Sequence, residues 1–177
     1  KSRRQLVDWG VFHVKPEFLT CWKNFHKSLT QRNAALKKKC TIAEINNWNS
    51  SLCEYGERIN TMRKEYIEQL KPIIHNLLTT LVPDTKSIKL SYKPGWDTKN
   101  SLEEVLIKNL SQDMLQGYTQ NGPQRFDILT LHDGTPIKDF FSQGQQKMFM
   151  YALACAQGVL LKQSTGKMPI YLIDDLP

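Results

Sequence analysis

An apolar stripe of helical period runs through residues 42–73 and constrains the fold of this chain more than any other sequence feature. A helix of about 30 residues is about 45 Å long, which is long for a domain of this size. The spacing averages close to 3.5 residues, which favours two helices packed side by side as a hairpin. The members of the stripe are Ile42, Ile45, Trp48, Leu52, Tyr55, Ile59, Met62, Tyr66, Leu70 and Ile73.

An earlier apolar stripe supplies the partner helix of this hairpin. It predicts a helix from about Pro16 to Lys38. Thr41 and Glu44 form a plausible capping box at the start of the longer stripe. Pro72 predicts a bend or break there, with a third short helix over 72–81. The members of the earlier stripe are Phe18, Trp22, Phe25, Leu29 and Leu36.

After residue 82 the pattern changes to alternating strands and helices. The sequence therefore predicts an α/β fold with an α-helical arm, in which the arm precedes an α/β lobe that lacks its beginning. The predicted elements are a strand at 87–92, a helix at 102–117 capped by Asn100 or Ser101, strands at 118–120 and 125–131, a turn at 132–134, a helix at 143–162 and a final strand at 169–174.

Composition narrows the classes of function. The 177 residues carry a net charge of +7, and residues 1–40 hold ten Lys or Arg against two acids. This basic end suggests a polyanion partner such as a phosphate backbone, although a solvated helix face with long lysines explains it equally well. The cysteines show no zinc-like spacing, so we expect reduced thiols in a cytoplasmic protein. We expect no secretory signal and no membrane span.

Residues 141–146, Phe-Ser-Gln-Gly-Gln-Gln, precede a predicted helix with a pattern suited to a phosphate. Ser142 and Gly144 stand at the helix start, where backbone N–H groups are unpaired and the helix dipole adds partial positive charge. Glycine also lets a ligand approach the backbone closely. An ordinary helix start with a serine cap has the same pattern, so this segment does not decide the function by itself.

Residues 170–175, Ile-Tyr-Leu-Ile-Asp-Asp, predict a buried parallel strand that ends in two carboxylates. Ligand sites of α/β sheets lie at such strand ends. Asp174 can hold Mg²⁺ there through its water shell, and Asp175 can orient or deprotonate an attacking water. A structural strand that ends in an acidic turn is the alternative.

The order and spacing of these two segments resemble the signature motif, helix and Walker B segment of ABC-type ATPases. Ser142 lies 32 residues before Asp174, with one helix and a short glycine-containing loop between them. The versions here, Ser-Gln-Gly-Gln-Gln and Leu-Ile-Asp-Asp, look like the RecF branch, which is related to SMC proteins, more than like transporter ATPases.

Three other stretches are similar to that branch, so the resemblance runs from Arg3 to Asp175. Gln124 stands where the family usually shows His, so no role of that imidazole is carried over. Arg125 and Asp127 match, but a structural ion pair across a strand explains them, and they stay outside the catalytic set. The stretches are Arg-Arg-Gln-Leu-Val-Asp at 3–8, Gln-Arg-Asn-Ala-Ala-Leu-Lys at 31–37 and Tyr-Thr-Gln-Asn-Gly-Pro-Gln-Arg-Phe-Asp at 118–127.

The resemblance implies that ATP and Mg²⁺ bind between two subunits of an ATP-dependent homodimer. Asp174 is then the Mg²⁺ ligand and Asp175 the catalytic carboxylate. No GxxxxGK[ST] sequence is present, so we expect these residues alone to neither bind ATP tightly nor hydrolyse it. The residues that would contact the nucleotide held by the partner are Ser142, Gln143, Gly144, Gln145 and Gln146.

The implied organisation is a connection from an ATPase head at 1–15, a helical arm at 16–82 and a partial ATPase lobe at 83–177. The implied function is ATP-dependent DNA binding in recombinational repair and at replication gaps, with double-stranded DNA, single-strand-gap junctions and recombination mediator proteins as partners. A non-catalytic helical DNA- or protein-interaction module and another SMC-like ABC ATPase remain alternatives. The DNA-binding candidates on the arm are Lys23, Lys27, Arg32, Lys37, Lys38 and Lys39; docking of a partner protein is the competing use.

Overall fold

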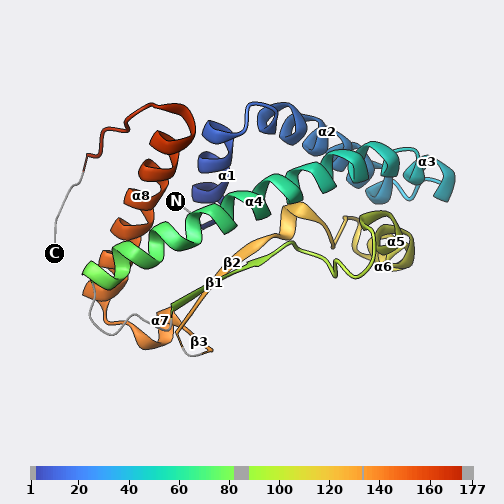
Figure 1. The fold of residues 1–177 in the computed structure, drawn as a ribbon. Helices are drawn as coiled ribbons and strands as arrows, with labels where there is room; N and C mark the ends of the chain where they lie inside the picture. The colour runs from blue at the N-terminus through green and yellow to red at the C-terminus, as the bar shows by residue number, and fades with distance from the viewer. Residues whose placement is uncertain (1–2, 82–87, 133, 173–177) are drawn as a thin grey trace. The chain divides into compact units, whose positions relative to one another are not determined.

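The computed structural model describes residues 3–81, 88–132 and 134–172, which form a mostly helical chain with a small sheet (Figure 1). The predicted class, α/β with a helical arm, is confirmed. None of the helices in these ranges has the length and apolarity that a membrane-spanning helix needs. The elements are α1 Arg3–Val14, α2 Phe18–Lys37, α3 Ile42–Asn46, α4 Asn49–Leu81, β1 Ile88–Lys93, α5 Leu102–Lys108, α6 Leu110–Gln116, the 3-10 turn η1 Pro123–Arg125, β2 Asp127–His132, β3 Thr135–Pro136, α7 Ile137–Phe140 and α8 Gln143–Thr165.

The chain divides into two compact units. We call residues 15–63 and 93–127 the hairpin unit, and residues 1–14, 64–92 and 128–177 the lobe unit. The predicted organisation places all of 83–177 in one lobe, whereas the structure packs 93–127 with the arm helices. Sequence order could not show this, because the grouping depends on contacts between residues far apart in the chain.

In the hairpin unit, α2 and the first half of α4 pack antiparallel, as the two stripes predict. The Arg63 guanidinium lies 5.9 Å from the centre of the Phe18 ring, and a methyl group placed on Gly56 would lie 3.4 Å from Phe25. Arg32 Nε donates to Asn49 Oδ1 at 2.9 Å. Contacting positions therefore advance by seven residues on α2 while they retreat by seven on α4, which is the repeat of antiparallel coiled-coil packing.

The break in the long stripe lies elsewhere than predicted. It falls at residues 47–48, after the short helix α3, whose capping box between Thr41 and Glu44 is present as expected. Helix α4 then continues through Pro72 to Leu81, so a break there and a separate third helix, both predicted, are wrong. A proline inside a helix removes one backbone hydrogen bond and costs roughly 3 kcal/mol. The buried side chains that flank it, Leu70, Ile74 and Leu78, offset this cost.

The segment after β1 also differs from the prediction. The single helix expected over 102–117 is two helices, α5 and α6, joined at Asn109. Ser101 caps α5 with a capping box, and Gly117 ends α6 in the left-handed conformation, φ 73°. Residues 118–120 form no strand, because they are held by side-chain contacts rather than by a neighbouring strand.

The lobe unit combines a sheet of order β1-β2-β3 with α1, α7, α8 and the second half of α4. β2 and β3 form an antiparallel hairpin in which Leu131 lies opposite Pro136. Helices α1 and α8 lie side by side (Figure 1), and Gln157 Nε2 donates to the carbonyl of Leu6 at 2.8 Å. The helix α1 was not predicted from the sequence.

The prediction of a final strand at 169–174 is wrong for residues 169–172, the part that the structure describes. Residues 169–172 are not a strand, and Ile170 and Leu172 are 90% and 94% exposed. A buried parallel strand needs hydrogen-bonded neighbours, and the described sheet, β1-β2-β3, does not include this segment.

Candidate nucleotide-contact site

The signature-like residues lie in the first turn of α8, a helix of 23 residues. Ser142 is the N-cap: its Oγ accepts from the backbone N–H of Gln145 at 3.3 Å, while Gln145 Oε1 accepts from the Ser142 N–H at 2.9 Å. Gln146 Nε2 donates to the carbonyl of Phe141 at 3.0 Å, and Phe141 is buried. The capping box therefore holds the start of α8 in a defined conformation.

The outer surface of this turn is open. Ser142, Gln143 and Gly144 are exposed, and nothing lies within 4 Å of a methyl group placed on Gly144. The capping box uses the backbone N–H of Gln145. The N–H groups of Gln143 and Gly144, at the same helix start, are not part of the box. An open turn with N–H groups and no side chain at Gly144 can accept a phosphate that another subunit presents.

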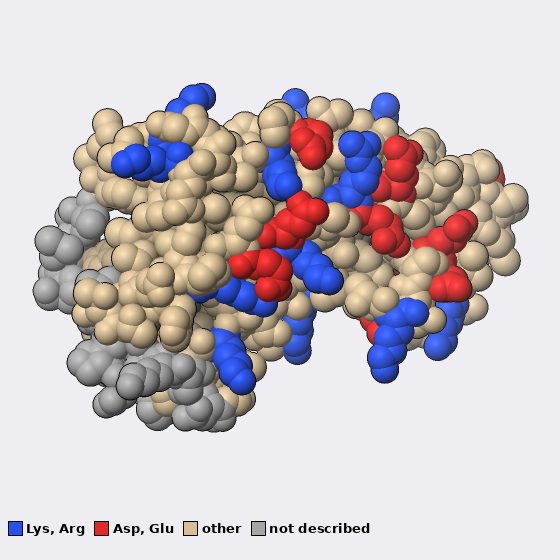
Figure 2. All heavy atoms as spheres, viewed as in Figure 1, with Lys and Arg blue, Asp and Glu red and all other residues tan. Residues whose placement is uncertain are grey.

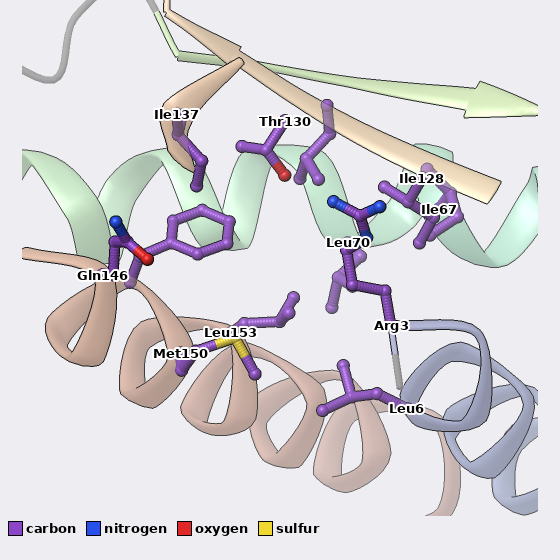
Figure 3. A pocket seen from close by; sticks show the side chains of 12 residues that line it. Arg3, Leu6, Ile67, Leu70, Ile128, Thr130, Ile137, Gln146, Met150 and Leu153 are labelled. Atoms are coloured by element: carbon purple, nitrogen blue, oxygen red, sulfur yellow. The ribbon is translucent and has the colours of Figure 1, made fainter. Parts of the chain in front are cut away.

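A cavity of about 160 Å³ lies beside α8 within the lobe unit (Figure 3). Figure 3 shows Gln146, Met150 and Leu153 of α8 on one side of it and residues of α4, α1 and β2 on the others. Its lining is mainly aliphatic, with Arg3, Thr130 and Gln146 as the polar members. A triphosphate needs several N–H groups and cations, so this cavity does not suit the phosphates of a nucleotide.

Helix α8 is held against α1 and α4 by a tight contact at Gly10. A methyl group placed on Gly10 would overlap the hydroxyl of Tyr66 and lie 2.8 Å from Nε2 of Gln157. Burial raises the pKa of the Tyr66 hydroxyl, which therefore stays neutral. The contact joins one residue from each of three helices and so fixes where the signature turn of α8 is displayed.

The two predicted Walker B carboxylates, Asp174 and Asp175, lie outside the described residues. The structure therefore shows no geometry for them. Among the described residues near them, Tyr171 Oη donates to the carbonyl of Ala154 in α8 at 3.2 Å, which places residue 171 beside that helix.

Five of the six DNA-binding candidates are exposed lysines of α2 and of the turn that follows it. At about 100° per residue, Lys27, Lys37 and Lys38 lie within about 60° of Lys23 around the helix axis, so these four lysines share one face. Lys39 follows in the left-handed conformation, φ 54°. In the view of Figure 2, basic and acidic side chains intermingle on the surface.

Arg32 is the exception, and its assignment as a DNA contact is wrong. It lies about 180° from Lys23 on α2 and is completely buried. Its Nη1 donates to Asp113 Oδ2 at 2.8 Å and to Thr119 Oγ1 at 2.6 Å. A phosphate backbone cannot reach a guanidinium that is buried and bonded in this way.

Arg32 belongs to a buried network that joins two of the family-like stretches. Asn33 Oδ1 accepts from the N–H and the hydroxyl of Thr119, both at 2.8 Å, and Asp113 Oδ1 accepts from the Gln120 N–H at 3.0 Å. Gln124, which stands where the family shows His, donates to the carbonyl of Thr119 at 3.2 Å. The stretches at 31–37 and 118–127 thus meet in space and support each other structurally.

One sequence signal could have revealed this network. The α2 stripe steps by four, three, four and then seven, and the missing position in the last step is Arg32. A charged residue at a core position of a helix requires a buried partner. That partner, Asp113, is 81 residues away, and no local pattern identifies it.

No family model matches the chain. DNA replication and repair protein RecF from Coxiella burnetii is 50% identical over 178 residues, which cover 100% of this chain and 49% of that protein. RecF from Vibrio parahaemolyticus is 41% identical over 175 residues, which cover 99% of this chain and 48% of that protein. The chain therefore spans about half the length of the curated relatives it matches.

Among solved structures, the recombination mediator protein RecF with ATP, from the RecFOR pathway, is similar with a TM-score of 0.87 at 26% identity. The match covers 98% of this chain and 49% of that chain. Agreement in sequence and in fold over the whole chain confirms the resemblance on which the motifs were assigned. The chain corresponds to the C-terminal portion of the RecF proteins, the DNA replication and repair family with which its motifs and its fold agree.

Proposed function

We propose that this chain is the signature-bearing part of a RecF-type, ATP-dependent DNA-binding protein that acts in recombinational repair and at replication gaps. The open, capped first turn of α8, with Gly144 clear of any neighbour, is the observation that carries the proposal. In the intact protein, residues 142–146 contact the γ-phosphate of ATP held by the partner subunit. RecF relatives that span the whole chain, and a solved RecF structure with ATP, support it.

The catalytic roles follow from the same assignment. Asp174 holds Mg²⁺ with the nucleotide, and Asp175 orients the attacking water. Asp175 is shorter than the Glu that transporter ATPases carry at this position. We therefore infer slow ATP hydrolysis that serves as a switch. If Asp175→Glu in the intact protein lowers hydrolysis while ATP binding is unchanged, this inference is wrong.

Gly144→Ala in the intact protein tests the proposal without disturbing the fold. Alanine is accommodated sterically and favoured in a helix, so the melting temperature should stay the same or rise. The added methyl group blocks the close approach of a phosphate to the backbone N–H groups. ATP-dependent dimerisation and hydrolysis should therefore fall at least tenfold, in line with the loss seen when one hydrogen-bond donor to the reacting group is removed. Both are measured by analytical ultracentrifugation and by phosphate release.

A matched control is Gly166→Ala, at the other end of α8, where a methyl group also meets nothing within 4 Å. Gly166 has φ 74°, so this variant is strained and slightly less stable, yet it should keep ATP-dependent dimerisation. Equal activity of Gly144→Ala and the wild type would refute the proposed phosphate contact.

The isolated chain should bind ATP weakly at most, because the P-loop of the family is not among its residues. Calorimetry that shows micromolar ATP binding by these 177 residues would contradict this expectation.

The lysine face of α2 is the proposed duplex contact. Lys23, Lys27, Lys37 and Lys38 span about 22 Å of helix at 1.5 Å per residue, a length that can follow several phosphates. Neutralising Lys37, Lys38 and Lys39 should weaken DNA binding and flatten its salt dependence. An unchanged salt slope would favour the alternative use of this face, docking a partner such as a recombination mediator protein.

A further inference from the structure

The loop that follows α6 presents an aromatic ring and a guanidinium together at the surface of the hairpin unit. Tyr118 is 37% exposed, and the Arg125 guanidinium carbon lies 5.7 Å from the centre of its ring. Arg125 is also exposed. At this distance the pair is a cation–π contact that still leaves the ring accessible to solvent.

The inner side of this loop is held firmly. The N–H and hydroxyl of Thr119, next to Tyr118, both donate to Asn33, and Gln124, next to Arg125, donates to the carbonyls of Thr119 and Asn121. The buried residues Arg32 and Asp113 fix the same segment from below. Because the backbone on either side is anchored, the exposed pair sits on a rigid base, as a binding site requires.

The backbone directly before Tyr118 lies beside the end of the lysine face. A methyl group placed on Gly117, the residue before Tyr118, would lie 3.5 Å from Cγ of Lys37 and 3.9 Å from its Cα. Lys38 and Lys39 follow directly in the chain and are exposed. The carboxylate of Asp113 is neutralised by Arg32 and buried, so it does not oppose the positive charge at this surface.

We propose that Tyr118 and Arg125 form a stacking site for an unpaired nucleobase, next to lysines that contact the adjoining phosphates. An aromatic face flanked by a guanidinium and a row of cations is the combination with which proteins bind single-stranded nucleic acid. The inference rests on the proposed DNA binding and adds the residue that discriminates unpaired from paired DNA. Bases within a duplex are already stacked on their neighbours and are not available to stack on the Tyr118 ring. An unpaired base beyond the end of a duplex is available.

The test uses the full-length protein and two DNA ligands, a blunt duplex and the same duplex with a single-stranded extension that carries 2-aminopurine beside the junction. Tyr118→Ala should weaken binding of the extended DNA roughly tenfold, the order expected for one lost stacking contact, and leave duplex binding unchanged. The quenching of 2-aminopurine by the wild type should disappear in this variant. Tyr118→Phe should retain both affinity and quenching, because stacking needs the ring and not the hydroxyl.

The salt dependence separates stacking from charge. Tyr118→Ala should leave the slope of log affinity against log salt unchanged, whereas neutralising Lys37, Lys38 and Lys39 should lower it on both ligands. Leu115→Ala is the matched control, since Leu115 is 79% exposed and two residues before Gly117. It should bind both DNAs like the wild type, and all variants should melt at the wild-type temperature.

Equal affinity of Tyr118→Ala and the wild type for the extended DNA would overturn the stacking site while leaving duplex binding by the lysines in place. Equal losses on both ligands would also overturn it. Absence of DNA binding by the wild type would reject the stacking site and the proposed function together. An acidic protein partner is the remaining use of the pair. It would be assigned if Tyr118→Ala lost binding of a polyglutamate peptide but kept the wild-type preference between the two DNAs.

Discussion

Nη1 of Arg32 lies 2.8 Å from Oδ2 of Asp113, and both side chains are buried, although the two residues are 81 positions apart in the chain. The pair connects α2 to α6 and, through Thr119 and Asn49, to the loop after α6 and the start of α4. The segment 93–127 therefore packs with the arm helices, and a residue that sequence assigns to DNA binding is part of the scaffold.

Removing one member of this pair should be strongly destabilising. Asp113→Ala leaves the Arg32 guanidinium buried without its counter-charge, so we expect the free energy of unfolding to fall by about 3–5 kcal/mol. Urea unfolding followed by tryptophan fluorescence measures this. The double variant Arg32→Met with Asp113→Leu should lose less than the single variant. Lys71→Ala, which removes an exposed pair with Glu68, is the control and should change stability by no more than about 1 kcal/mol.

Gly10→Ala should also destabilise the chain, because the added methyl group overlaps Tyr66 and crowds Gln157. Overpacking of this kind costs about 1–3 kcal/mol. Gly144→Ala makes the same chemical change within a helix where nothing is nearby, and it should be neutral or stabilising. Thermal melting of the two variants compares them directly, and equal melting temperatures would show that α1 moves to accommodate the methyl group.

Pro72→Ala should stabilise the chain. Pro72 is exposed in the middle of a continuous helix, so alanine restores a backbone hydrogen bond without disturbing packing. A gain of about 1–3 kcal/mol is expected after allowance for the more flexible unfolded chain. Chemical unfolding monitored by circular dichroism measures it. A loss of stability would mean that the proline ring makes a packing contact worth more than the hydrogen bond.

Cys53 should remain a thiol at pH values where an ordinary cysteine ionises. Burial, followed by the negative charges of Glu103 and Glu57, raises the pKa of Cys53 from 9.0 to about 12. The folded state then retains a proton that the unfolded state releases, so this group's contribution to stability is complete below pH 9.0 and is lost as pH rises towards about 12. Stability should fall with pH over this interval, and less so in Cys53→Ala.

Alkylation provides a direct measurement of the same thiol. Iodoacetamide reacts with the thiolate, so native Cys53 should be alkylated much more slowly at mildly alkaline pH than in urea, as followed by peptide mass spectrometry. Equal rates in the two states would contradict a raised pKa.

Local sequence signals determined the elements that have a strong period or a cap. The stripe through Phe18 and Phe25, the capping box at Thr41 and the serine cap at Ser142 all predicted helices that the structure contains. The signature-like turn was also identified from its residues, because serine, glycine and glutamine at a helix start are chemically specific. These features depend on neighbours within about one helical turn, and sequence reports such neighbours directly.

Tertiary structure decided what depends on distant contacts. It showed that α4 continues through Pro72, that residues 169–172 are not a strand, and that Arg32 is a buried partner of Asp113 rather than a DNA contact. The position of Gly117, the residue before Tyr118, beside Lys37 likewise follows from packing between residues about 80 positions apart. Residue types and helical period can be read directly from the sequence. The burial of a charge and the pairing of a strand depend on distant residues that only the folded chain brings together.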